Sequence, residues 1–130
     1  MTKKDALVSQ FERTVVNLRE VLTKLETAKK DRAVLRDSAV KRFEIAFDSC
    51  WKTLKEKLRN EHGVDVLSPK KVFQEAFKQG IIENENIWLD ITDTRNETSH
   101  TYNEEMAEKV LASLPKACST MEKLLWKLKK

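Results

Sequence analysis

The chain has 130 residues, with 25 Lys and Arg, 21 Asp and Glu, and a formal net charge of +4. A chain of this length can bury one hydrophobic core, so we expect one domain over residues 1–130. Two glycines and two prolines leave little material for turns, while 40% hydrophobic and 35% charged residues suit amphipathic helices. The composition predicts an all-α protein and argues against a low-complexity linker.

Membrane and secreted classes are disfavoured by the same sequence. No apolar stretch approaches the roughly 20 residues that span a bilayer, and no apolar signal-peptide segment follows Met1–Asp5. We therefore expect a cytoplasmic protein with no membrane segment. Cys50 and Cys118 are too few for a disulfide framework or a zinc site, so we expect both to be reduced thiols in the core.

The first half of the chain predicts two long helices that form an antiparallel hairpin. The first runs from Asp5 to about Lys30, and the second from about Ser38 to Glu61 with Gly63 as its C-cap. Apolar residues recur three and four positions apart along both segments. They are Phe11, Val15, Leu18, Leu22 and Leu25 in the first, and Val40, Phe43, Phe47, Cys50, Trp51, Leu54 and Leu58 in the second.

A connector over residues 64–67 leads to a short third helix, which Ser68 caps and Pro69 opens, and which ends near Gly80. Ile87, Trp88 and Ile91 begin a fourth amphipathic segment. The pattern Thr101-Tyr102-Asn103-Glu104 is typical of a capping box, and four threonines weaken the helix before it, so we expect a break between Arg95 and Thr101.

The last helix carries an apolar seam from Met106 to Leu128, and we expect Pro115 to kink it. The whole pattern predicts an up-down bundle of four to five helices, with no strand and no internal repeat.

Residues 95–102, Arg-Asn-Glu-Thr-Ser-His-Thr-Tyr, concentrate chemically active side chains. The Arg95 guanidinium can hold phosphate oxygens in a bidentate fork, and the His100 imidazole can move protons near neutral pH. Tyr102, the only tyrosine, offers a phenol that can act as a nucleophile or be modified. On a continuous helix Trp88, Arg95 and Tyr102 would share one stripe. If the chain bends, Arg95 instead closes one helix and His100 precedes the next.

Each of these residues also has an ordinary structural explanation. Arg95 could pair with Asp93 or Glu85, His100 could bond a helix end, and Tyr102 could be a core residue. The surrounding charge is unfavourable for an anionic ligand. Residues 81–108 hold eight carboxylates and Arg95 alone, a balance of −7 that leaves +11 for the rest of the chain. The charge distribution alone does not identify a partner.

The string Arg95-Asn96-x-x-Ser99-His100-Thr101-Tyr102 resembles the R-x4-H-x-Y motif of HEPN-domain proteins. More narrowly, it resembles the branch called nucleotidyltransferase substrate-binding proteins. HEPN domains are helical bundles that commonly form homodimers, and many are metal-independent ribonucleases. The resemblance implies that His100 acts as general base or acid on RNA, that Arg95 stabilises phosphoryl charge, and that Asn96 supports them. It implies no cofactor and no metal.

The resemblance also implies a partner, a separate minimal nucleotidyltransferase. In toxin–antitoxin versions that partner silences the ribonuclease by transferring AMP onto the motif tyrosine, here Tyr102. The chain itself cannot be the transferase, because Gly63 and Gly80 are far apart and form no Gly-rich loop for a triphosphate. Two alternatives stay open. One is a non-catalytic module that presents a substrate to the transferase, and the other is an assembly-only bundle.

Overall fold

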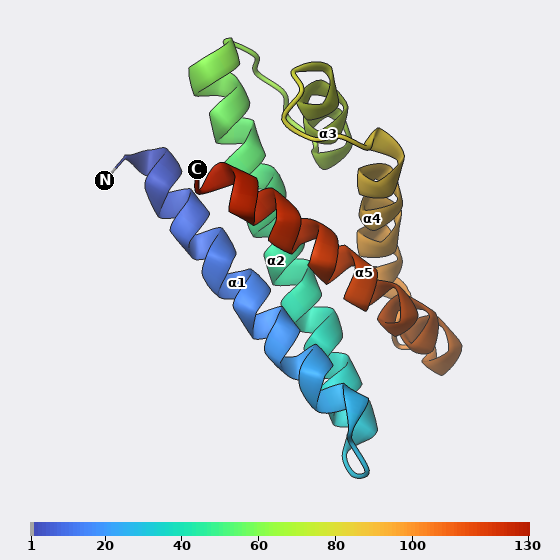
Figure 1. Cartoon of the computed structure of the whole chain (residues 1–130). Helices are drawn as coiled ribbons and strands as arrows, with labels where there is room; N and C mark the ends of the chain where they lie inside the picture. The colour runs from blue at the N-terminus through green and yellow to red at the C-terminus, as the bar shows by residue number, and fades with distance from the viewer. Residues whose placement is uncertain (1) are drawn as a thin grey trace.

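The computed structural model describes residues 2–130, and over this range the chain contains only helices, turns and loops. Figure 1 shows their arrangement as a helical bundle. The elements are α1 (Lys3–Glu26), α2 (Arg32–His62), α3 (Pro69–Lys78), α4 (Glu85–Glu97), the 3-10 helix η1 (Thr98–His100) and α5 (Glu104–Leu128). The all-helical fold predicted from composition and periodicity is confirmed.

Helices α1 and α2 run side by side in opposite directions, as predicted for the first hairpin (Figure 1). A reciprocal cap begins α1, because Thr2 Oγ1 accepts from the Asp5 amide at 3.1 Å and Asp5 Oδ2 accepts from the Thr2 amide at 3.1 Å. The predicted ends facing the hairpin loop are wrong. Helix α1 ends at Glu26 rather than Lys30, and α2 begins at Arg32 rather than Ser38.

Local signals at the other end of α2 predict the structure correctly. Gly63 caps α2 with φ of 66°, a left-handed conformation that glycine adopts at little cost. Pro69 occupies the first turn of α3, and Ser68 Oγ accepts from the Lys71 amide at 3.4 Å. Helix α3 ends at Lys78, just before Gly80 at φ of 76°.

The predicted break between Arg95 and Thr101 is confirmed, since α4 ends at Glu97 and η1 follows it. The predicted capping box is wrong. Asn103 caps α5, its Oδ1 accepting from the amides of Glu105 at 2.9 Å and Met106 at 3.2 Å. The Thr101 hydroxyl instead donates to the Thr98 carbonyl at 3.1 Å. Pro115 lies inside α5, which continues through it to Leu128.

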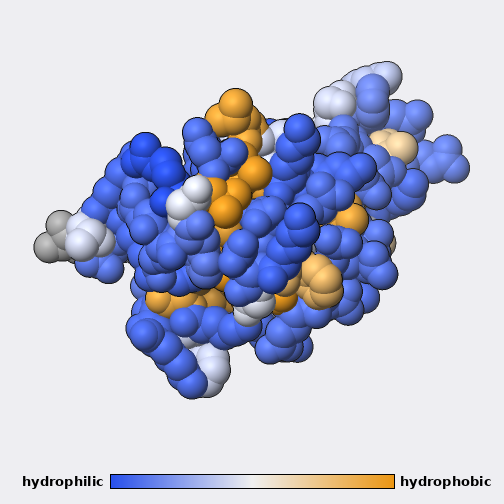
Figure 2. Space-filling view, turned by 90° about the horizontal axis from the view of Figure 1, so that it is seen from above, coloured by the Kyte–Doolittle hydropathy of each residue, from blue (hydrophilic) through white to orange (hydrophobic). Residues whose placement is uncertain are grey.

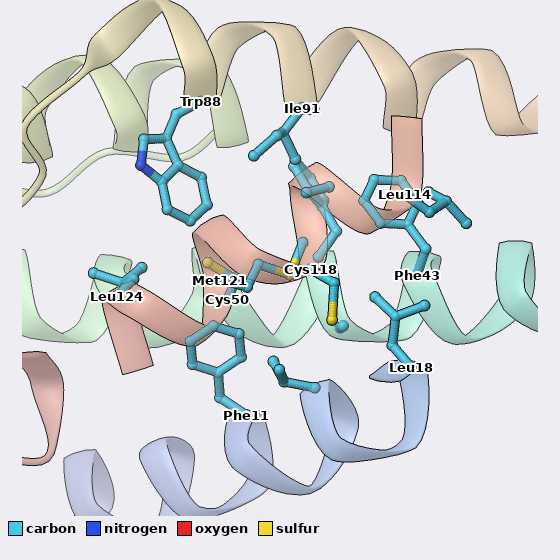
Figure 3. Close-up of a cluster of buried hydrophobic side chains, with 14 of the residues drawn as sticks. Phe11, Leu18, Phe43, Cys50, Trp88, Ile91, Leu114, Cys118, Met121 and Leu124 are labelled. Carbon is cyan, nitrogen blue, oxygen red and sulfur yellow. The ribbon is translucent and has the colours of Figure 1, made fainter. Parts of the chain in front are cut away.

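The core forms where α1, α2, α4 and α5 converge, and Figure 3 shows side chains from all four helices meeting there. Phe73 of α3 extends this core, because its ring stacks on Trp88 of α4 with centroids 4.9 Å apart. Cys50 and Cys118 are free, buried thiols, as predicted. Burial raises the pKa of both, that of Cys118 to about 11.

The face drawn in Figure 2 is mostly hydrophilic, and hydrophobic side chains form scattered patches on it. The large hydrophobic residues exposed among residues 2–130 are Val16, Val34, Ile45, Leu67, Phe77, Tyr102 and Trp126. Among those same residues, no helix is both long enough and apolar enough to cross a membrane.

Candidate functional site

Arg95 lies in the last turn of α4 and directs its guanidinium group toward α2. Its Nη1 donates to Glu44 Oε2 at 3.0 Å and to Thr98 Oγ1 at 3.0 Å. Its Nη2 donates to Asp48 Oδ2 at 3.4 Å. We call Arg95, Thr98, Glu44 and Asp48 the Arg95 cluster. The predicted alternative partners on α4, Asp93 and Glu85, are wrong.

The Arg95 cluster is partly shielded from water. Side-chain exposure is 28% for Arg95, 22% for Glu44 and 43% for Asp48, while Thr98 is buried. Thr98 Oγ1 lies 2.9 Å from Glu44 Oε2 and 2.7 Å from the Arg95 carbonyl, and its single hydrogen can serve one of them at a time. Arg95 Nε is buried and has no hydrogen-bond partner among the described residues. The guanidinium is therefore held through Nη1 and Nη2, while its Nε donor has no acceptor among the described residues.

Sequence reasoning missed Glu44 and Asp48. These residues stand four apart on α2, so one helix face presents both carboxylates. That spacing was visible in the sequence, but nothing local connects it to Arg95, which lies 51 positions after Glu44.

His100 ends η1 and Tyr102 lies in the turn before α5, and both are exposed. Their rings meet edge to face, with centroids 6.2 Å apart and planes at 74°. Tyr102 is 86% exposed, so the explanation of Tyr102 as a core residue is wrong. The single stripe through Trp88, Arg95 and Tyr102 is also wrong, because α4 ends at Glu97. The phenol and imidazole are open to solvent and to any second molecule.

Asn96 lies beside Arg95 but outside the Arg95 cluster. It is exposed, and its carbonyl accepts a hydrogen bond from Ser99 Oγ at 3.0 Å. This bond stabilises the turn from α4 into η1 rather than the guanidinium group.

A second arginine anchors the chain just after Tyr102. The Arg36 side chain is 6% exposed, and its Nη1 donates to Glu104 Oε2 at 2.7 Å and Glu108 Oε2 at 2.9 Å. Arg32 Nη1 also donates to Glu108, at 2.9 Å. Hydrogen bonds from Arg32 and then Arg36 lower the pKa of Glu108 to about 2, and Arg36 lowers that of Glu104. The first turn of α5 is thereby fixed to the first turns of α2.

A groove of about 830 Å³ lies between the segment that enters α4 and the second half of α5, lined by Ile82, Trp88, Leu124, Trp126 and other residues. None of Arg95, Asn96, His100 and Tyr102 lines it. Over residues 2–130, no group of three or more His, Cys, Asp or Glu is arranged to hold a metal ion.

A family model described as "Nucleotidyltransferase substrate binding protein like" matches residues 7–130. The chain belongs to this family. The nucleotidyltransferase substrate-binding resemblance drawn from the Arg95–Tyr102 motif is thereby confirmed. The chain is also similar to a curated relative, the "Probable ribonuclease HepT" of Haemophilus influenzae, with 31% identity over 80 residues. That match covers 58% of this chain and about half, 55%, of the relative.

Two solved structures share the fold of this family member. A protein from Thermus thermophilus has a TM-score of 0.83 and 32% identity, covering 92% of this chain and 99% of its own. The Haemophilus influenzae protein HI0074, described as revealing the fold of a substrate-binding domain of a nucleotidyltransferase, has a TM-score of 0.68 and 26% identity. The second similarity covers 98% of this chain and 97% of that one.

Proposed function

We propose that this chain is a HEPN-type subunit that forms a complex with a separate minimal nucleotidyltransferase and cleaves RNA without a metal ion. Family membership and the similarity to HI0074 support the transferase partner. The similarity to a probable ribonuclease HepT supports RNA as the substrate. The observation that carries the proposal is the junction of α4 and α5, where Arg95, His100 and the exposed Tyr102 lie within eight residues.

The proposed reaction uses the 2′-hydroxyl of RNA as the nucleophile. His100 accepts the proton of that hydroxyl, the 2′-oxygen bonds to phosphorus, and the bond from phosphorus to the 5′-oxygen breaks. A proton must then reach the departing 5′-oxygen, and the products are a 2′,3′-cyclic phosphate and a 5′-hydroxyl. Arg95 stabilises the negative charge on the phosphoryl oxygens. Asn96 supports the turn that carries both residues.

A homodimer would complete this site. His100 and Tyr102 are exposed on the single chain, and the 830 Å³ groove lies elsewhere. A second copy placed against the α4–α5 junction would supply a second His100, so that one imidazole acts as base while the other acts as acid. Sedimentation or light scattering of the purified chain tests this, and a monomer at assay concentration would contradict it.

The cleavage test uses RNA, excess EDTA and three proteins. We expect the wild type to cut, His100→Ala to lose cutting by at least a hundredfold, and His62→Ala to cut normally. His62 is the matched control, because it is the other histidine of the chain and is exposed at the end of α2. Cleavage that survives His100→Ala would remove His100 from the mechanism.

Tyr102 is the proposed site of AMP transfer by the partner, because its side chain is 86% exposed and its phenol is open to a second protein. The phenol oxygen would attack the α-phosphate of ATP, releasing pyrophosphate. Co-expression with the transferase followed by peptide mass spectrometry tests this, with Tyr102→Phe as the control. Modification retained in Tyr102→Phe would place the acceptor elsewhere.

A second candidate function is a non-catalytic module that presents a substrate to the transferase. The Arg95 cluster favours it, because Glu44, Thr98 and Asp48 already occupy much of the guanidinium group. This candidate predicts nucleotide binding by the purified chain and no RNA cleavage by any preparation, with or without the partner.

A further inference from the structure

Arg95 cannot offer a two-pronged fork to phosphate in the observed arrangement. A guanidinium carries five N–H hydrogens, and bidentate recognition uses two of them side by side. Both Nη1 hydrogens are directed at Glu44 and Thr98, and one Nη2 hydrogen is directed at Asp48. The Nε hydrogen is buried and unpaired. Only one Nη2 hydrogen is left for a ligand.

The two carboxylates of the Arg95 cluster differ in strength. Glu44 lies 3.0 Å from Nη1, also contacts Thr98 Oγ1 at 2.9 Å, and is 22% exposed. Asp48 lies 3.4 Å from Nη2, has no second partner in the cluster, and is 43% exposed. A shorter, better shielded and shared contact is the harder one to break. Displacement of Asp48 is therefore the less costly way to free an edge of the guanidinium.

We propose that Glu44 is a positioning residue for Arg95 and that Asp48 is an internal competitor for phosphate. A phosphodiester that enters the site takes the place of the Asp48 carboxylate on Nη2, while Glu44 and Thr98 keep Nη1 fixed. Once Asp48 has left, both Nη2 hydrogens can serve the phosphate, while Nη1 stays paired with Glu44 and Thr98 and Nε stays buried. The identity of the ligand rests on the proposed function.

Opposite effects are expected from neutralising the two residues. Asp48→Asn removes a charge that both competes for Arg95 and repels phosphate, so binding should tighten about fivefold. Glu44→Gln loosens the guanidinium, so the rate of cleavage should fall while affinity changes less. A purely structural role would instead lower stability and leave both parameters alone.

The test measures binding of a 2′-O-methyl oligoribonucleotide, which cannot be cut because the attacking hydroxyl is blocked. Fluorescence anisotropy at one fixed low salt concentration compares the wild type with Asp48→Asn, Glu44→Gln and the control Asp65→Asn. Asp65 is an exposed carboxylate in the connector before α3, so its variant makes the same charge change away from Arg95. Circular dichroism verifies that each variant is folded.

A Kd for Asp48→Asn about fivefold below that of Asp65→Asn supports the inference. An equal or weaker affinity overturns it, even if the wild type binds and cuts RNA. Cleavage assays on RNA add the second readout, a lower KM for Asp48→Asn and a lower kcat for Glu44→Gln. If neither the wild type nor any variant binds the oligonucleotide, the inference and the proposed function both fail. If the protein binds the oligonucleotide but never cuts RNA, only the proposed ribonuclease activity is ruled out.

Discussion

Thr98 offers the sharpest test of how the Arg95 cluster is held together. Its buried hydroxyl accepts from Arg95 Nη1 at 3.0 Å and lies 2.9 Å from Glu44 Oε2. The change Thr98→Val keeps the β-branched shape and the volume but removes the hydroxyl. One hydrogen of a partly buried guanidinium then loses its acceptor.

The magnitude follows from the type of bond that is lost. A hydrogen bond to a charged group contributes about 1.5–3 kcal/mol to stability, and burial of the added methyl group offsets part of this. We expect Thr98→Val to lower the free energy of unfolding by about 2 kcal/mol. For a chain of this length that corresponds to a fall in Tm of about 7 °C.

Two other buried threonines on α4 provide matched controls. The hydroxyl of Thr92 donates to the Trp88 carbonyl at 2.8 Å, and that of Thr94 donates to the Asp90 carbonyl at 3.2 Å. Both acceptors lie four residues earlier in the same helix, where the backbone ladder also uses them. Replacing either residue by valine should therefore cost no more than about 0.5 kcal/mol.

Urea unfolding followed by far-UV circular dichroism measures all three variants. The protein concentration must be the same throughout, because self-association would add to apparent stability. A cost for Thr98→Val no larger than that for Thr92→Val would refute the view that Thr98 holds Arg95. A second comparison uses the Glu44→Gln background, in which Thr98→Val should cost measurably less, because the two residues bind the same Nη1.

Three further predictions concern stability. Gly63→Ala should cost about 1 kcal/mol in urea unfolding, because a side chain at φ of 66° is strained although nothing lies within 4 Å of its Cβ. Asn103→Ala should cost about 1 kcal/mol and Thr101→Ala less, since Asn103 caps α5; the reverse order would restore the predicted capping box. The pKa of Glu108 lies at about 2 in the folded chain against 4.5 ordinarily, so its stabilisation is complete above about pH 4.5 and is lost as pH falls toward 2. Acid titration of Arg36→Met should show a shallower loss over that window, and an unchanged slope would contradict the role of Arg36.

The parts of the fold that the sequence predicts correctly are those with local causes. The left-handed cap at Gly63 and the Ser68-Pro69 start of α3 each depend on one or two neighbouring residues. The start of α2 was predicted too late because its first turns are held by contacts between Arg36 and α5, 68 and 72 positions away. No local pattern contains that information.

The candidate site also contains some residues that local sequence predicts and others that it does not. Arg95, His100 and Tyr102 follow from their spacing in eight residues, and the break that ends α4 after Arg95 was visible in the threonines around them. Glu44 and Asp48 were not predicted, because an acidic pair four apart on a helix is usually a solvated face. Whether Glu44 and Asp48 contact Arg95 depends on how α4 packs against α2, and sequence periodicity does not predict that packing.

Ion pairs compensate many of the carboxylates that surround the motif. Near His100 and Tyr102, Glu97 pairs with Lys109, and Glu104 and Glu108 pair with Arg36 and Arg32, so three cations meet these three carboxylates.

Near Arg95 the balance is different, because one guanidinium faces the two carboxylates of Glu44 and Asp48, a local sum of −1. An anion should therefore meet little repulsion on the side of His100 and more on the side of Arg95. Under the proposed function, phosphate would first approach the exposed imidazole and phenol. Arg95 would bind the phosphate only after the Asp48 carboxylate moves away from Nη2. Asp48 would therefore both oppose phosphate binding and delay the contact with Arg95 until after the contact with His100.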